Sequence, residues 1–209
     1  MLQLSAVQKF YNKDLILDIP QLHLESGIYW VKGANGSGKT TLLKMIAGLI
    51  PFKGDISFKN TSLQNDPLAY RQMVSWAEAE PLFPLFMTGM ELVCLYGSIR
   101  NISKKDIAEL LEIFSLHDYV NNSIGTYSAG MTKKLSLVLA FIGNTSLIVL
   151  DEPLITLDPY AFTAACKFIL ERFKNTGTAF LMSSHQDLDT ELTLSGKEIT
   201  VINRSVLIK

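Results

Sequence analysis

The sequence predicts an α/β fold that has a core with a mostly parallel sheet, an antiparallel β subdomain at the N-terminus and an inserted helical lobe. Residues 1–31 alternate apolar and polar side chains, which is typical of short strands with one buried face. Fully apolar runs such as residues 147–150 recur later with helical segments between them, as in parallel sheets buried on both faces. Between about residues 78 and 135, helix-start signals replace strand signals, which indicates a helical lobe inserted between two core strands.

Local signals place each element in chain order. The N-terminal strands are expected to break at Asn12–Lys13, at Pro20 and at residues 25–27, because turn residues and proline interrupt a strand ladder. The first strand is expected to end at Phe10 and Tyr11. The later expectations are a helix with Leu42, Leu43, Ile46 and Leu49 on one face, ended by Gly48 and Pro51; strands at 54–58 and 73–77; helices opened by capping boxes at 88–91 and 103–106; a helix from Ser128 to Ile142; a strand at 147–150; a helix from Asp158 to about Lys174; a strand at 178–182; and a hairpin around 203–204.

The composition limits the possible functions. The chain has 209 residues, which suits one domain over residues 1–209, and its net charge of −1 gives no support for nucleic-acid binding. Its longest apolar run, residues 135–142 with Ser136 inside it, is far shorter than the ~18 residues of a membrane span. Nothing at the N-terminus marks the chain for secretion, so we expect a cytoplasmic protein. Cys94 and Cys166 are expected to be buried free thiols on apolar helix faces.

A glycine-rich segment between an apolar run and a helix has the pattern G-x-x-x-x-G-K-[ST]. Its glycines let successive backbone N–H groups point at one anion, and the helix that follows adds the positive end of its dipole. Lys39 supplies a point charge for the outer phosphates, and Thr40 supplies a hydroxyl ligand for Mg²⁺. The pattern therefore predicts a P-loop NTPase core that binds a polyphosphate. The expected contacts are Gly33, Ala34, Asn35, Gly36, Ser37, Gly38, Lys39, Thr40 and Thr41.

Two acidic residues follow the apolar strand at 147–150. Asp151 lies at the carboxyl end of this strand, where it can hold Mg²⁺ together with Thr40. Glu152 can polarise a water in line with the terminal phosphate, as a general base or as a water-positioning residue. The pair helps to choose among kinases, GTPases and ATPases, which the phosphate loop alone leaves open.

With these motifs the chain resembles the ATP-binding-cassette (ABC) ATPases over nearly its whole length. Residues 127–131, Tyr-Ser-Ala-Gly-Met, stand where that family has its LSGGQ signature, about twenty residues before the Asp-Glu pair. They keep its serine and second glycine, and the other three residues differ from the consensus. Residues 151–153 resemble the Walker B motif with its catalytic glutamate, residues 156–158 resemble the D-loop, and His185 resembles the switch histidine. Tyr11 falls where the family places an aromatic ring against adenine.

The resemblance implies a single ABC ATPase domain over residues 1–209, with ATP as the nucleotide and Mg²⁺ as the metal. It implies Glu152, His185 and Lys39 as catalytic residues, and it counts Asp158 of the D-loop among the nucleotide-binding residues. It also implies a head-to-tail dimer, either a homodimer or a pair of cassette subunits. In that dimer Ser128 and Gly130 of one protomer would face ATP held by the other.

One departure from the family concerns the segment after the strand at 73–77. The family usually has a glutamine there that touches Mg²⁺ and the attacking water, but the register on Pro81 puts Ala79 at this position, between Glu78 and Glu80. Alanine has no ligand atom. Either one of the two glutamates takes its place, or the link between the nucleotide and the helical lobe is altered in this chain.

The implied function is that of an ATPase subunit of a membrane transporter, peripheral on the inner face of the membrane. ATP binding would close the dimer, hydrolysis would open it, and the helical lobe would pass this motion to separate transmembrane subunits. The apolar residues expected to touch those subunits are Phe83, Leu85, Phe86 and Met87. The short lobe favours an exporter-type system slightly.

Two alternatives remain. A soluble ABC ATPase of DNA repair or translation would usually carry a long coiled coil, a zinc insertion or two cassettes, and none of these is visible in the sequence. A small-molecule kinase or a GTPase would be another kind of P-loop enzyme. The sequence has no Asn-Lys-x-Asp motif for guanine, and a kinase would leave residues 128–130 without a role.

Overall fold

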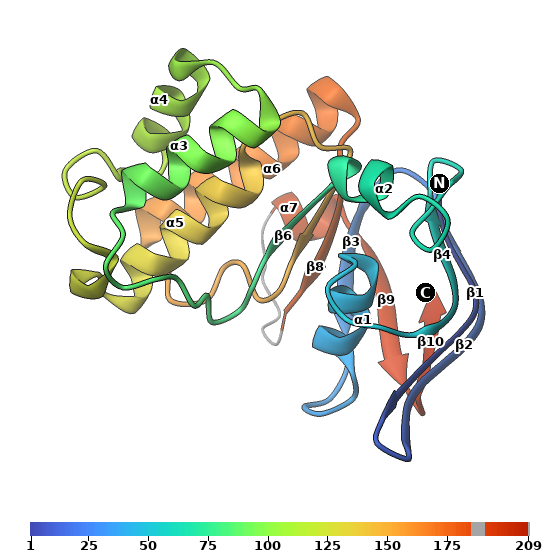
Figure 1. The fold of residues 1–209 in the computed structure, drawn as a ribbon. Coiled ribbons are helices and arrows are strands. Elements are labelled where there is room, and N and C mark those ends of the chain that lie inside the picture. Colours follow the sequence, from blue (N-terminus) through green and yellow to red (C-terminus); the bar gives the residue numbers. More distant parts are fainter. Residues whose placement is uncertain (185–190, 209) are drawn as a thin grey trace.

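The computed structural model describes residues 1–184 and 191–208, which form two sheets and a set of helices (Figure 1). The larger sheet has six strands in the order β10-β9-β3-β8-β7-β6. It is parallel from β9 to β6, and only β10 pairs antiparallel, with β9. The expectation of an α/β fold with a mostly parallel sheet is confirmed. The strands are β3 (Ile28–Lys32), β6 (Val74–Ala77), β7 (Leu147–Leu150), β8 (Ala179–Ser183), β9 (Lys197–Ile202) and β10 (Ser205–Ile208).

The smaller sheet is antiparallel and has the strand order β2-β1-β4-β5, with β1 (Leu2–Tyr11), β2 (Asp14–Leu24), β4 (Lys53–Phe58) and β5 (Thr61–Ser62). The expected strand break at Pro20 was wrong, because β2 runs through it. Since β2 lies at the edge of this sheet, a residue without an N–H donor can be accommodated there. The expected breaks at Asn12–Lys13 and at residues 25–27 do separate β1, β2 and β3.

Most helices follow the sequence signals. Thr88 and Glu91 form the predicted capping box of α3, and Ser103 caps α4. Leu49 was expected on the buried face of α1, but it is 53% exposed, since α1 ends at Ile46 and the chain turns at Gly48. The sequence signals did not predict α2, the 3₁₀ turn η1 or α7. The helices are α1 (Lys39–Ile46), α2 (Pro67–Met73), α3 (Gly89–Arg100), α4 (Lys104–Ile113), η1 (Ile124–Thr126), α5 (Ala129–Phe141), α6 (Pro159–Thr176) and α7 (Glu191–Leu194).

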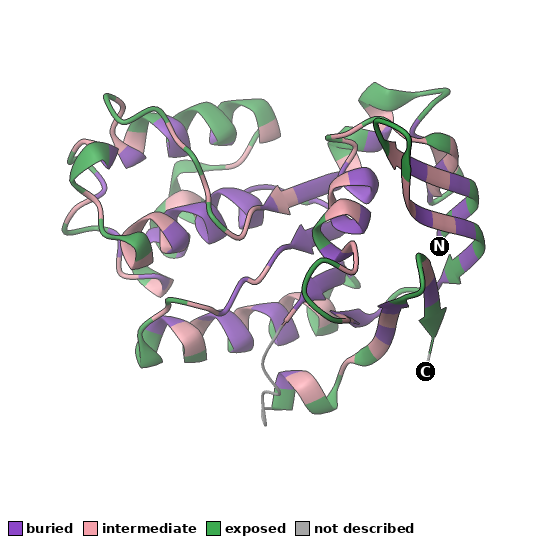
Figure 2. Cartoon of the chain, turned by 90° about the horizontal axis from the view of Figure 1, so that it is seen from below, coloured by how far each residue is buried: buried purple, intermediate pink, exposed green. Residues whose placement is uncertain are grey.

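The two faces of the six-stranded sheet support separate hydrophobic cores. Alternate residues of the strands, such as Trp30 and Leu150, pack with helices α3 to α6, while their neighbours Val31 and Val149 pack with α1 and the small sheet. In Figure 2 the buried residues follow the central strands, and the exposed residues gather on loops and outer helix faces. Within the described ranges, no helix has both the length and the apolar character needed to cross a membrane.

Only one of the two cysteines is buried, whereas both were expected to be. Cys166 on α6 is a buried free thiol, as predicted, but Cys94 on α3 is exposed. Apolar residues are spread around α3, so the sequence pattern does not identify which side of the helix faces the core.

Candidate active site

The glycine-rich loop joins β3 to α1, in the strand, loop and helix order that the motif requires. Gly38 caps α1 with a φ of 103°, and Gly36 has a φ of 74°, a left-handed region that favours glycine. A Cβ atom at Gly33 would lie 2.6 Å from both the Ser37 hydroxyl and the Val201 carbonyl oxygen. The glycines are therefore needed for the path of the backbone itself.

Lys39 lies across this loop as the first residue of α1. It is only 6% exposed, and its ammonium donates to the carbonyl oxygens of Gly33 at 2.8 Å and Ala34 at 3.0 Å. Burial lowers the pKa of Lys39, and the carboxylates of Glu152 and Asp151 oppose this lowering. The Ser37 hydroxyl is buried with no hydrogen-bond partner among the described residues. A loop with a cation and an unpaired hydroxyl fits a phosphate group.

Tyr11 at the end of β1 lies beside the same loop. A cavity of about 460 Å³ is bounded by its ring on one side and by the loop and the start of α1 on the other. The ring is 47% exposed, and the Lys9 ammonium lies 4.6 Å from its centroid. The structure therefore brings the candidate adenine contact to the candidate phosphate contacts. The cavity is lined by Tyr11, Ile16, Asn35, Gly36, Gly38, Lys39, Thr40 and Thr41.

Thr40 and Asp151, the two expected metal ligands, are in direct contact. The Thr40 hydroxyl donates to Asp151 Oδ2 at 2.8 Å, which joins α1 to the carboxyl end of β7. Both side chains offer the hard oxygen ligands that Mg²⁺ prefers. The described residues contain no group of three or more His, Cys, Asp or Glu side chains that could hold a metal. The Thr40 and Asp151 oxygens fit an ion such as Mg²⁺, because this ion is usually bound by one or two protein ligands together with phosphates and water.

Glu152 follows Asp151 at the same end of the sheet. Its backbone has a φ of 47°, a left-handed conformation that is uncommon for a residue other than glycine. Its N–H donates to the Ser183 hydroxyl at 2.8 Å, and that hydroxyl donates to Asp151 Oδ1 at 2.6 Å. The sheet therefore places Lys39, Thr40, Asp151 and Glu152 around one region, where a carboxylate can act on a water beside a phosphate.

The signature residues lie elsewhere in the chain. Ser128 is the N-cap of α5 and accepts from the Met131 N–H at 3.2 Å, so its hydroxyl has a structural partner. A Cβ atom at Gly130 would lie 3.0 Å from the Thr156 carbonyl oxygen, which puts the first turn of α5 against the expected D-loop. Figure 1 shows this end of α5 in the helical lobe, away from the loop before α1. The structure does not bring Ser128 and Gly130 to the phosphate loop of the same chain.

Asp158 and His185 complete the expected set. Asp158 caps α6 by accepting from the Ala161 N–H at 2.9 Å, and it pairs with Lys134 of α5 at 2.6 Å. The hydrogen bond from Lys134 is the main cause that lowers the pKa of Asp158. The structure therefore gives Asp158 a capping and pairing role between α5 and α6. His185 lies outside the described residues.

The segment around Ala79 is held by two lysines. The Glu78 carboxylate forms an ion pair with Lys44 of α1. Lys133 of α5 donates to the carbonyl oxygens of Glu78 at 3.1 Å and Ala79 at 3.0 Å. The Glu80 side chain is exposed.

Sequence reasoning missed three of the residues that bind the site together: Lys44, Lys133 and Ser183. Lys133 is 1% exposed and Ser183 is fully buried. The signals for Lys133 and Ser183 are a lysine just before the apolar run of α5 and a serine that ends an apolar strand, and no such signal points to Lys44. Only the structure reveals what these three side chains contact.

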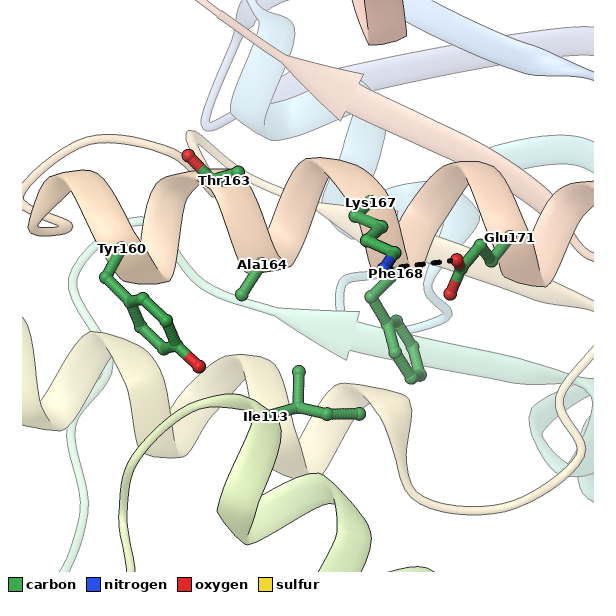
Figure 3. Close-up of a pocket in the computed structure, with 7 residues that line it drawn as sticks. All are labelled: Ile113, Tyr160, Thr163, Ala164, Lys167, Phe168 and Glu171. Carbon is green, nitrogen blue, oxygen red and sulfur yellow. Dashed lines mark ion pairs between the residues drawn. The ribbon is translucent and has the colours of Figure 1, made fainter.

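A second groove lies between α6 and the end of α4 (Figure 3). Tyr160 and Phe168 extend from α6 on the side of Ile113, and the Lys167–Glu171 ion pair lies on the same helix. None of the candidate nucleotide-binding or catalytic residues lines this groove. It is lined by Ile113, Tyr160, Thr163, Ala164, Lys167, Phe168 and Glu171.

Comparisons with known proteins identify the family of this chain. The family model described as ABC transporter matches residues 19–155. The cytochrome c biogenesis ATP-binding export protein CcmA of Legionella pneumophila is 33% identical over 190 residues, which cover 90% of this chain and 94% of that protein. The protein of the same name from Reclinomonas americana is 33% identical over 207 residues, which cover 93% of this chain and 91% of that protein.

Solved structures show the same fold. The ATP-binding subunit of an ABC transporter superposes with a TM-score of 0.87 at 26% identity, over 99% of this chain and 88% of the other. A dimeric ATP-binding cassette bound to ADP and Pi in a post-hydrolysis state gives a TM-score of 0.85 at 20% identity, over 99% of this chain and 96% of the other. This chain belongs to the ABC transporter family, as one of its ATP-binding and ATP-hydrolysing subunits.

Proposed function

We propose that this chain binds MgATP between Tyr11 and the phosphate loop and hydrolyses it with Glu152. The observation that supports this most directly is the contact of Thr40 with Asp151 at 2.8 Å, beside Lys39 and Glu152. In this proposal the loop N–H groups and Lys39 hold the phosphates, and Thr40 and Asp151 hold Mg²⁺. The ion would neutralise charge on the phosphates. Glu152 would orient and deprotonate the attacking water, and His185 would assist at the terminal phosphate.

We propose further that two cassettes pair head to tail, either as a homodimer or with a second cassette subunit. Ser128, Gly130 and Asp158 would then meet the nucleotide held by the other protomer. Ser128 and Asp158 are exposed, and Gly130 lies in the first turn of α5, where a helix N-terminus favours an anion. An ATP-binding cassette of the same fold is dimeric, which supports the pairing of two cassettes.

The expected membrane partners are transmembrane subunits, with this chain peripheral on their cytoplasmic side. Leu85 is 66% exposed and Phe86 is 85% exposed, so these residues of the proposed contact surface are free to be covered by a partner. Phe83 and Met87, also expected there, pack partly against the core. We propose that residues 1–209 act as a single ATPase domain whose helical lobe, at about 78–135, transmits the motion. The name of the first relative supports export over import.

The test measures binding and hydrolysis in one variant, Glu152→Gln. We expect this variant to bind MgATP as the wild type does, to lose hydrolysis, and to run as a dimer on size exclusion when MgATP is present. Without its base the bound ATP cannot be turned over, so the closed dimer persists. The matched control is Glu171→Gln on α6, remote from β7 in sequence and outside the candidate site, which should keep wild-type turnover. Full hydrolysis by Glu152→Gln would contradict the assignment.

A further inference from the structure

The peptide bond between Asp151 and Glu152 is held from both sides by side chains of other elements. On one side the Asp151 carbonyl oxygen accepts from Lys133 of α5 at 3.2 Å. On the other side the Glu152 N–H donates to Ser183, the last residue of β8, at 2.8 Å. Both side chains are almost fully buried. Because a peptide unit is planar, fixing its C=O and its N–H fixes the orientation of the whole plane.

This orientation matters because Glu152 has an uncommon backbone conformation. A φ of 47° at a residue that carries a side chain costs free energy and persists only when its surroundings enforce it. The direction of the Glu152 side chain depends on this φ and on the plane before it. A small rotation of the plane would move the carboxylate away from the region of Thr40 and Lys39. The hydrogen bond from Ser183 to Asp151 Oδ1 at 2.6 Å fixes the neighbouring carboxylate as well.

We propose that Lys133 and Ser183 are positioning residues for hydrolysis, which together hold the Asp151–Glu152 peptide so that Glu152 faces the attacking water. This inference rests on the proposed function, because it assumes that Glu152 acts on that water. Neither residue needs to touch the nucleotide. We refer to the two side chains as the peptide clamp.

Lys133 also joins the clamp to the segment that lacks the usual glutamine. Its ammonium donates to the carbonyl oxygens of Glu78, Ala79 and Asp151, so one buried cation connects α5, the segment after β6 and the end of β7. These bonds use main-chain oxygens, so they do not depend on the side chain at position 79. The link between this segment and the catalytic carboxylates is therefore present in this chain even with Ala79.

The number of donors on Lys133 matches what the clamp needs. An ammonium group has three N–H donors, and this one reaches three carbonyl oxygens, those of Glu78, Ala79 and Asp151. A side chain without these donors cannot hold the three segments together.

The first experiment tests Ser183 in the purified full chain. We expect Ser183→Ala to lower the kcat for ATP by about ten- to hundred-fold, the worth of a hydrogen bond that involves a charged group, while the Kd for ATP changes by less than about threefold. Ser183→Thr, which keeps the hydroxyl, should restore most of the activity. The matched control is Ser75→Ala, a buried strand serine that lies opposite Ile148 on β7 and carries none of these bonds.

Hydrogen exchange at the Glu152 amide tests the role of Ser183 without any need for turnover. We expect the Glu152 amide hydrogen to exchange at least about tenfold faster with solvent in Ser183→Ala than in the wild type, because its acceptor is gone. The Ser75→Ala control should leave the exchange rate of this amide unchanged. Unchanged exchange at Glu152 in Ser183→Ala, or an unchanged kcat with Ser183→Ala in an active protein, overturns the role of Ser183.

The second experiment tests Lys133 with Lys133→Met and Lys133→Arg. Lys133→Met should lower kcat while the Kd for ATP changes by less than about threefold, whereas Lys133→Arg, which keeps a charged donor, should restore part of the activity. An unchanged kcat with Lys133→Met in an active protein overturns the role of Lys133. A wild type that neither binds nor hydrolyses ATP would instead refute the proposed function, and the exchange measurement would still decide the clamp.

Discussion

Replacing Lys39 by methionine tests the central electrostatic claim about the phosphate loop. Methionine keeps most of the buried volume and removes only the charge and the hydrogen bonds. In the structure the ammonium donates to Gly33 and Ala34 at 2.8 and 3.0 Å, so it lies over the loop where a phosphate would bind. The substitution therefore removes the one side-chain cation that is itself part of the motif.

The loss of ATP-binding free energy in Lys39→Met follows from two opposing contributions. A unit charge pair at ~4 Å with an effective dielectric constant of ~20 is worth ~4 kcal/mol. Turning toward a phosphate would cost the ammonium one of its bonds to the loop carbonyls, at ~1 kcal/mol. The net loss on Lys39→Met is then ~3 kcal/mol, which raises the Kd for ATP on the order of 100-fold.

Isothermal titration of MgATP into the purified chain measures this change directly. The matched control is Lys104→Met, which makes the same substitution at an exposed lysine of α4 and should leave the Kd unchanged. Thermal unfolding of both variants shows whether the fold is intact. A Kd for Lys39→Met within about threefold of the wild-type value would refute the reasoning, since it would mean that the ammonium contributes less than one ordinary hydrogen bond.

Three further results are expected. Tyr11→Ala should weaken ATP binding by about 1–3 kcal/mol, the usual worth of stacking a base on an aromatic ring, and should leave binding of inorganic triphosphate unchanged, as two parallel titrations would show. Cys94 should react with a maleimide within minutes, whereas Cys166, whose pKa burial raises to about 11, should react only after denaturation, as mass spectrometry would detect. Phe141→Ala should lower the free energy of unfolding by about 3–5 kcal/mol in urea titrations, since the ring is fully buried and packs against the rings of Phe114 and Phe168.

Much of the fold was predictable because strong local signals coincide with tertiary structure. The capping residues Thr88, Ser128 and Asp158 open helices as expected, since their side chains satisfy N–H groups whatever the rest of the chain does. Pro20 and Leu49 were misjudged for different reasons. An edge strand tolerates proline, and the edge position of β2 depends on tertiary structure. Leu49 follows the turn at Gly48 that ends α1, so the local stop signal itself places this side chain outside the helix.

The candidate site also contains some residues that the sequence predicts and some that only the structure identifies. Lys39, Thr40, Asp151 and Glu152 are identified by motif spacing, and parallel strand topology explains why distant motifs meet at one edge of the sheet. Ser183 and Lys133 could not be assigned from the sequence, because their importance lies in which main-chain atoms they reach. Those contacts depend on β8 lying next to β7 and on α5 packing beside them.

The position of β3 in the sheet bears on the order in which the protein can acquire its structure. This strand leads into the phosphate loop early in the chain, but its two neighbours are β8 and β9, made from residues 179–183 and 197–202. While the chain emerges from the ribosome, β3 has neither edge covered until residues 179–183 have been synthesised. Such distant pairing slows folding and leaves an apolar segment exposed to aggregation in the meantime. Competence to hold nucleotide therefore has to wait until residues 179–202 have followed the phosphate loop out of the ribosome.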